Sequence, residues 1–342
     1  MERPSRDKIR IPYFAFLVIG AFIMLGVFVI SLTVGQYQMT FGNVFRALFG
    51  NANSMTDDIV IWELRLPRTI TACLVGMALG VAGLVYQSTF QNELASPDII
   101  GVSSGASVGV ALGLLLGLPI LVISGVGFLF GALAMVLTLL LARVFRNKSP
   151  IMLIIAGVLI SGLMGSIVSL IKSMADAESV LPTIVYWLMG SFASVKMVHV
   201  WVLLPVVICG SLFLFAISGK IINNVALGYE EAKSKGINYK AWRIVILIIG
   251  TILTASCVAV AGAIGWVGLV VPHIARLIVG QTAQKTIPIT LLFGGTFMML
   301  ADILARTLIT SEIPVGAITG IIGIAIFIII LCFQRGRKYY AD

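Results

Sequence analysis

Long uncharged stretches, separated by short charged segments, run along most of the chain. They lie at 11–45, 69–92, 99–142, 149–171, 179–195, 197–219, 244–275, 286–301 and 313–334. A helix needs about 20 consecutive apolar residues to cross the hydrocarbon core of a bilayer. Most of these stretches allow one crossing, so the pattern predicts an all-α polytopic membrane protein. The first stretch exceeds the roughly 7–15-residue core of a signal peptide, so we interpret it as an uncleaved span.

Two of these stretches are too long for one simple span. The 44 residues of 99–142 predict two helices with a turn at Leu118-Pro119. The 32 residues of 244–275 fit either one long pass or one full pass followed by a short return through 262–265. Two passes in the second stretch give ten transmembrane helices in total, and one pass gives nine.

The distribution of positive charge favours ten transmembrane helices. Lysine and arginine accumulate in the cytoplasmic loops of membrane proteins. With ten spans, both termini are cytoplasmic and 17 of the 23 lysines and arginines lie on that side; with nine, the split is 13 to 10. Because Pro182 breaks the stretch 179–195, we expect an interfacial or re-entrant segment there. The chain is thus predicted to form one transmembrane domain, 1–342, with cytoplasmic segments at 1–10, 220–243 and 335–342.

Composition excludes several classes of protein. Hydrophobic residues make up 59% of the chain, charged residues make up 11%, and the mean hydropathy is +1.09. A soluble domain carries about 25% charged residues, and a disordered chain is poor in apolar residues. The four cysteines form no CxxC pair, only two histidines are present, and the chain has no G-x-x-x-x-G-K-[ST] motif. We therefore expect no metal site, no cofactor, no nucleic-acid partner and no ATP bound by this chain.

The acidic residues bear on the source of energy. All 14 fall at or near the end of a predicted span. Ion-coupled carriers usually place an ionisable side chain near the bilayer midplane, so the pattern disfavours an ion-coupled secondary transporter. Energy would then come from another polypeptide, which needs a cytoplasmic docking surface. The longest cytoplasmic loop offers a short mixed-charge helix between Gly228 and Gly236, although a solvated connecting loop has the same pattern.

Glycines recur at helical spacing in two of the predicted spans. They are Gly101, Gly105, Gly109, Gly113 and Gly117 in one, and Gly76, Gly80 and Gly83 in another. A stripe of small residues lets a neighbouring helix backbone approach closely. We expect tight packing at these stripes; helices that slide or tilt during transport are the alternative.

Several motifs, in order along the chain, carry a resemblance to one family. They are LRLPR at 64–68, QSTFQNELASPDIIGVSSGA at 87–106, YW at 186–187 with GS at 190–191, GAIGWVGLVVPHIAR at 262–276, AD at 301–302 with AR at 305–306, and EIPVG at 312–316 followed by Thr319 and Gly323. The chain resembles the FecCD-type permeases of bacterial ABC importers for iron–siderophores, haem and vitamin B12. It departs from the family pattern at Glu93, Trp266, 281–285 and Ala325, and these departures disfavour a close assignment to the vitamin B12 branch.

The resemblance implies a function and a set of partners. It implies the ABC type II importer permease fold, in the bacterial cytoplasmic (inner) membrane, with a second permease subunit, identical or homologous, beside it. Two ABC ATPase subunits and an extracytoplasmic siderophore-binding protein complete the transporter. The chain itself is not an enzyme: it moves a ferric siderophore by alternating access, with haem or cobalamin as alternative cargoes.

The resemblance also implies site residues at the two ends of the spans. ATPase coupling falls on Leu227, Gly228, Glu230, Glu231 and Gly236. Docking of the binding protein falls on Arg65, Arg68 and Arg306, because guanidinium groups bind carboxylates in bidentate fashion. Arginines at helix ends also snorkel towards water without any partner, which is the alternative explanation for these three.

The remaining implied residues concern the path and the packing. The gate falls near Ser149 and Pro150, and a mildly polar path falls on Ser161, Ser166 and Ser169; helix packing explains the same serines. Pro272 removes a backbone donor and is expected to end or kink its span. We expect His273 to make a structural hydrogen bond, because a lone imidazole lacks the partner ligands that iron requires. Gly101, Gly105 and Gly109 are assigned to packing.

Overall fold

The computed structural model describes residues 12–144 and 150–339, and every regular element in these ranges is a helix. The helices are α1 (Tyr13–Thr33), α2 (Phe41–Leu48), α3 (Met55–Ile59), α4 (Leu66–Phe90), α5 (Val102–Leu115), α6 (Ile120–Val144), α7 (Pro150–Met174), α8 (Val180–Leu188), α9 (Met197–Ile217), α10 (Asn223–Leu227), α11 (Tyr229–Ser234), α12 (Tyr239–Ala261), α13 (Val267–Val279), α14 (Ala283–Thr307) and α15 (Val315–Tyr339). Two π-helical segments, η1 (Val60–Arg65) and η2 (Ser218–Ile222), continue into α4 and out of α9.

Seven helical segments in the described ranges are long and apolar enough to cross a membrane. They are Tyr13–Thr33, Met55–Phe90, Ile120–Val144, Ile151–Met174, Met197–Leu227, Tyr239–Ala261 and Ala283–Thr307. Three shorter apolar helices accompany them, at Val102–Leu115, Val267–Val279 and Val315–Ile330. The seven long segments and the three short helices follow the order of the apolar stretches in the sequence, and the count of ten membrane crossings stays a prediction. The protein is therefore an integral membrane protein.

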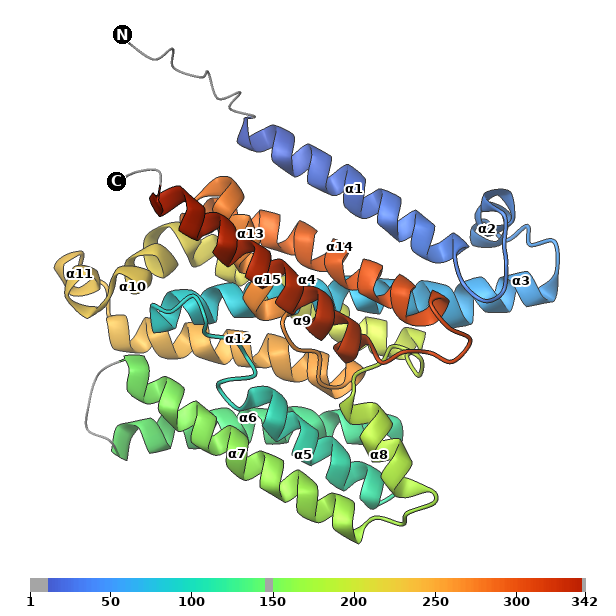
Figure 1. Cartoon of the computed structure of the whole chain (residues 1–342), viewed down its shortest axis with the longest axis horizontal. Coiled ribbons are helices and arrows are strands. Elements are labelled where there is room, and N and C mark those ends of the chain that lie inside the picture. The colour runs from blue at the N-terminus through green and yellow to red at the C-terminus, as the bar shows by residue number, and fades with distance from the viewer. Residues whose placement is uncertain (1–11, 145–149, 340–342) are drawn as a thin grey trace.

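The helices lie side by side around α4 (Figure 1). Most residues of α4 are buried, and α4 contacts α14, α12, α13 and α9. Figure 1 places α2 and α3 at one end of the bundle, which we call the α2–α3 end, and α10 and α11 at the other, which we call the α11 end. Helix α1 begins and α15 finishes towards the α11 end.

Each of the two long uncharged stretches holds two helices, as its length predicted for 99–142 and as the charge distribution favoured for 244–275. Helices α5 and α6 are joined by a turn at 116–119 that contains Leu118-Pro119. Helix α12 ends at Ala261 and α13 begins at Val267, so the second stretch holds a full pass and a short return. The stretch 179–195 forms only the nine residues of α8, which are too few to cross a bilayer.

The glycine stripes bring helix backbones together. A Cβ placed on Gly76 would lie 2.0 Å from the backbone oxygen of Gly294 on α14, and one on Gly83 would lie 1.8 Å from that of Gly268 on α13. A Cβ on Gly105 or Gly109 would lie about as close to the backbone of α6, at 2.6 and 2.5 Å from carbonyl oxygens. These positions are closed to any side chain, which is the close helix approach that the stripes predicted.

Candidate functional site

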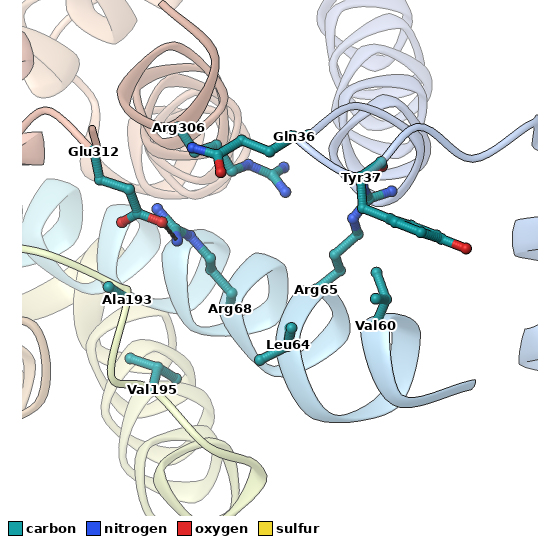
Figure 2. Close-up of a pocket in the computed structure, with 11 residues that line it drawn as sticks. Gln36, Tyr37, Val60, Leu64, Arg65, Arg68, Ala193, Val195, Arg306 and Glu312 are labelled. Carbon is teal, nitrogen blue, oxygen red and sulfur yellow. Dashed lines mark hydrogen bonds and ion pairs between the residues drawn. The ribbon is translucent and has the colours of Figure 1, made fainter. Parts of the chain in front are cut away.

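Three arginines and Glu312 meet at the α2–α3 end of the bundle (Figure 2), and Asp302 pairs with two of these arginines. Arg65 closes η1 and Arg68 lies in the first turn of α4. Asp302 and Arg306 lie four residues apart on α14, so they share one helix face. Glu312 lies in the loop before α15. Segments from both halves of the chain therefore build this group, which we call the arginine cluster.

Arg68 is held by two carboxylates. Its Nε donates to Asp302 Oδ1 at 2.8 Å, and its Nη1 donates to Glu312 Oε1 at 2.6 Å. The Asp302 side chain is fully buried, whereas that of Glu312 is 27% exposed. Arg68 thereby joins α4, α14 and the loop before α15, and Glu312 is the acid of the cluster that solvent reaches.

Arg306 and Arg65 donate inward as well. Arg306 Nη2 donates to the backbone oxygen of Ser31 at 2.6 Å and to its Oγ at 2.7 Å, and Arg306 Nε lies 3.5 Å from Asp302 Oδ2. Arg65 Nη1 donates to the backbone oxygens of Leu32 and Thr33, and its Nη2 donates to that of Tyr37. The end of α1 and the loop that follows it are therefore fastened by arginines from α4 and α14.

A pocket of about 310 Å³ opens beside the cluster and is lined by all three arginines and Glu312. The cluster sets three guanidinium groups against the carboxylates of Asp302 and Glu312, so it keeps one positive charge in excess, and Glu312 is the one carboxylate in the pocket lining. Tyr37, also in the lining, donates to Asp57 Oδ1 at 2.9 Å, and this hydrogen bond raises the pKa of the Tyr37 phenol. All three arginines are at least nine-tenths buried and bonded within the chain. The docking role assigned to them stays a prediction.

A short helix stands out at the opposite end, where the mixed-charge segment was expected. Helix α11 follows Gly228, whose φ of +106° and ψ of −178° suit only glycine, and precedes Gly236, with φ of +72°. Glu230 and Glu231 lie in its first turn and are exposed, as is Leu227. The loop that carries α11 is shorter than the predicted 220–243, because η2 and α10 continue α9 to Leu227 and α12 begins at Tyr239.

The segment 91–101 runs from the α11 end into the middle of the bundle. Gln91 Nε2 donates to the backbone oxygen of Ala226, beside α11. Further along, the Oγ of Ser161 donates to the backbone oxygen of Asp98 at 3.2 Å. Ser161 is the twelfth of the 25 residues of α7, so Asp98 lies level with the middle of a helix long enough to cross a membrane. The expectation that every acid lies near a span end is wrong for Asp98.

Comparison with known proteins places this geometry in a family. A profile of the FecCD transport family matches residues 23–333. The chain belongs to the FecCD transport family. The molybdate import system permease protein MolB of Haemophilus influenzae is 37% identical over 98% of this chain and 99% of its own length. The "Probable iron chelatin transport system permease protein" of Helicobacter pylori is 34% identical over 90% of this chain and 92% of its own length.

A solved structure gives the same answer at the level of the fold. It is described as an inward-facing conformation of a candidate metal-chelate type ABC transporter, and it matches with a TM-score of 0.83 and 34% identity over 94% of this chain and 99% of that one. This FecCD chain is thus a membrane permease of the ABC importer type. Permeases of this family are transport subunits and not enzymes.

The serines assigned to the path lie on one helix of the FecCD chain. Ser166 and Ser169 are exposed on α7 and donate to the backbone oxygens of Gly162 and Gly165 one turn earlier. Such bonds within a helix use the single hydrogen of each hydroxyl, and the exposed oxygen can still accept a hydrogen bond at the surface. Pro150 begins α7, and Ser149 lies outside the described residues.

Pro272 and His273 lie in the middle of α13 of this permease, not at its end. The helix continues to Val279, so Pro272 does not terminate it. His273 Nδ1 lies 3.4 Å from Glu93 Oε2, and its ring packs edge-on against Phe327 of α15. Glu93 is the residue that stands where the family usually has proline. Within the described part of the chain, no three histidine, cysteine or acidic side chains gather closely enough to hold a metal ion.

Sequence reasoning missed the acids and the serine that hold the arginines of this FecCD permease. Asp302 and Glu312 were noted only as motif letters, and Ser31 was not noted at all. The spacing of Asp302 and Arg306 on one helix face was a usable signal. The pairing of Arg68 with residues more than 230 positions away carries no local signal, because the folded bundle brings them together.

Proposed function

We propose that this chain is the transmembrane permease subunit of an ATP-driven importer that moves a ferric siderophore across the bacterial cytoplasmic membrane by alternating access. The match over nearly the whole chain to a metal-chelate type ABC transporter carries the proposal. A relative named for iron chelatin transport supports the same cargo class. Haem and cobalamin are the alternative cargoes, and the relative named for molybdate adds a third.

The orientation that fits this role has ten spans and puts the α11 end in the cytoplasm. Many lysines and arginines of the described residues lie in the segments at this end: Lys220, Lys233, Lys235, Lys240, Arg243 and Lys285. The positive-inside rule then makes this end cytoplasmic. The arginine cluster faces outward, where a binding protein arrives.

A second permease subunit, identical or homologous, would cover the face that carries α7. The non-helical segments 91–101 and 262–266 lie at the depth of long helices, and non-helical backbone is tolerated at membrane depth only against protein or water. Residues of α7 on this face are exposed and mostly apolar, including Leu159, Leu163 and Leu170. In an importer whose path lies between two permeases, the second subunit covers the apolar residues of α7, and the non-helical segments face protein or the water of the path.

Two ABC ATPases would dock at α11. The helix is exposed and is bounded by two glycines with positive φ, and Gln91 of the segment 91–101 donates to the backbone oxygen of Ala226 in α10, just before α11. A displacement of α11 is therefore transmitted to the segment that reaches the middle of the bundle. Closure of the ATPases on ATP moves α11, and the resulting tilt of the helices alternates access to the path.

The decisive experiment is uptake by the complete transporter in vesicles. The permease is affinity-purified with its native partners, the partners are identified by mass spectrometry, and the complex is reconstituted with its binding protein. We expect ATP-dependent accumulation of a ⁵⁵Fe-labelled siderophore that survives collapse of the proton gradient. Uptake that stops when the gradient collapses and continues without ATP would establish an ion-coupled secondary transporter instead.

A further inference from the structure

Asp98 lies where three segments of the permease converge. Its backbone oxygen accepts a hydrogen bond from Ser161 on α7, and α5 begins four residues further along the chain. A Cβ on Gly265, in the break between α12 and α13, would lie 3.5 Å from Asp98 Oδ2. Asp98 and Gly265 are both partly exposed. The carboxylate therefore stands at the surface, between two non-helical segments.

The depth of Asp98 follows from the helices around it. Helix α5 has 14 residues and is about 21 Å long, which is shorter than the roughly 30 Å hydrocarbon core. The other end of α5 turns directly into α6. The segment 91–101 therefore spans the part of the hydrocarbon core that α5 does not cover. Thr138, six residues before the end of α6, donates to the backbone oxygen of Ile100 at 3.0 Å. The segment that carries Asp98 thus lies inside the membrane thickness.

The surface formed by Asp98 and the two non-helical segments beside it is not suited to contact with lipid. Non-helical backbone does not face hydrocarbon, and ionisable side chains at this depth face a water-filled cavity or the interior of a bundle. Within the described residues, no ion pair joins Asp98 to a lysine, arginine or histidine. The partly exposed carboxylate therefore meets water or another protein at this surface, and not lipid.

Asp98 is the acid of these segments that has no cationic neighbour within the described residues, because Glu93 lies beside His273 and Arg276 of α13. The stretches 91–101, 150–171, 262–266 and 315–334 contain Glu93 and Asp98 and no lysine or arginine. Two facing copies of the chain would double this charge. A path lined in this way repels anions and admits neutral or cationic solutes, because unpaired charges in a low-dielectric wall act strongly on what passes.

We propose that Asp98 is a specificity-determining residue of the transport path, which selects a metal chelate of zero or positive net charge over anionic cargo. The inference rests on the proposed function, and it narrows the cargo. A ferric tris-hydroxamate, which is neutral or carries a pendant ammonium group, suits the path. A ferric tris-catecholate, with three negative charges, and the molybdate oxyanion do not.

A charge-selective thiol assay tests the residue independently of any cargo. Ser161→Cys is placed in the assembled transporter after its four native cysteines have been replaced, and its reaction with a cationic and an anionic methanethiosulfonate is timed. A unit charge about 5 Å away in water changes each rate by about fourfold in opposite directions. We expect the cationic reagent to react faster, and Asp98→Asn to lower the ratio of the two rates by about sixteenfold.

A second cysteine position and a control make the assay decisive. Gly265→Cys places its sulfur beside the same carboxylate, in case Ser161→Cys fails to fold. Asp58→Asn, an exposed acid on α3, should leave both rates unchanged. Thiols that do not react, or a rate ratio indifferent to Asp98→Asn, would overturn the proposal.

Transport by the same complex separates this inference from the proposed function. Uptake of a cationic ferric tris-hydroxamate should fall at least severalfold in Asp98→Asn, and uptake of its N-acylated neutral form should change less. Equal uptake of both forms by wild type and variant overturns the role of Asp98 and leaves the importer intact. A wild-type complex without ATP-dependent uptake of any metal chelate would instead contradict the proposed function.

Discussion

Asp302 is the residue on which the arginine cluster depends. It is fully buried and faces Arg68 at 2.8 Å and Arg306 at 3.5 Å. Burying charges is costly, and removing one partner of a buried pair costs more than the pair contributes, because the remaining charge stays uncompensated. The cluster therefore fastens α4, α14 and the end of α1 whatever it binds.

Asp302→Asn should destabilise the protein strongly. The substitution leaves Arg68 and Arg306 without their shared carboxylate, which costs about 3–5 kcal/mol for buried pairs. The measurement is thermal unfolding in detergent, with Asp58→Asn as the matched change of an exposed acid. A melting temperature equal to that of the control would show that the two arginines are adequately solvated without Asp302.

Glu312→Gln tests the docking role of the cluster while leaving every arginine in place. Glu312 is the partly exposed acid beside the pocket, and its removal raises the positive charge that an acidic partner meets. We expect tighter binding of the cognate binding protein and a steeper loss of affinity with rising salt. Titration by light scattering or calorimetry measures both, and unchanged or weaker binding would count against docking at this pocket.

At the scale of the element, helix breaks and glycine contacts decide what each segment does. Helices α5 and α13 are short because 91–101 and 262–266 replace their missing turns. Glycines then allow the intact helices to approach: Gly76 faces Gly294 and Gly83 faces Gly268. The same short segments that interrupt the helices carry the polar backbone into the middle of the bundle.

Gly76→Ala should disrupt the contact between α4 and α14. The added Cβ would lie 2.0 Å from the backbone oxygen of Gly294, and a backbone cannot move aside as a side chain can. We expect a loss of several degrees in melting temperature, or a loss of monodisperse protein in size-exclusion chromatography. Gly26→Ala on α1 is the control, since nothing lies within 4 Å of its added Cβ.

Charge reversal on α11 should uncouple the ATPases from transport. Glu230 and Glu231 are exposed in the first turn of α11 and make no ion pair within the described residues. Replacing both with lysine should leave the melting temperature near that of wild type and lower substrate-stimulated ATP turnover and uptake. Glu178→Gln, an exposed acid in the loop before α8, serves as control. Normal stimulated turnover in the double variant would refute the coupling role.

At the scale of the whole molecule, one face carries the features that demand a partner. The segment 91–101 contacts α7 through Ser161 and approaches 262–266 at Gly265, while α1 lies on the other side of the bundle from α7 (Figure 1). An apolar surface made of helices can face lipid, whereas a surface that contains non-helical backbone must face protein or water. The asymmetry of the fold therefore orients the permease within its assembly.

A photoreactive benzophenone amino acid should locate the second permease. Placed at Ser166 on α7, it should yield a product of the mass of two permeases, whose second component is identified by mass spectrometry as an identical or a homologous chain. Placed at Phe22, an exposed residue of α1, it should attach to lipid. Permease dimers linked through Phe22 and not through Ser166 would place the interface on the opposite side.

The sequence by itself determined the class of protein, the order of the apolar helices and the glycine-lined faces on which helices approach closely. Each of these depends on local hydrophobicity and helical spacing, which are written along the chain. The division of 99–142 and the short helix between Gly228 and Gly236 followed from the same local signals, and the distribution of positive charge along the chain favoured the division of 244–275. Motif order also led to the FecCD family.

The tertiary structure alone decided which side chains meet. Arg68 reaches Asp302 and Glu312 across more than 230 residues, so three arginines expected at the surface are bonded inside the bundle. Asp98 looked like an acid at a span end, and the short α5 and its contact with Ser161 carry it to the middle of α7. Pairings between distant segments depend on how the helices pack, and no local pattern along the chain encodes them.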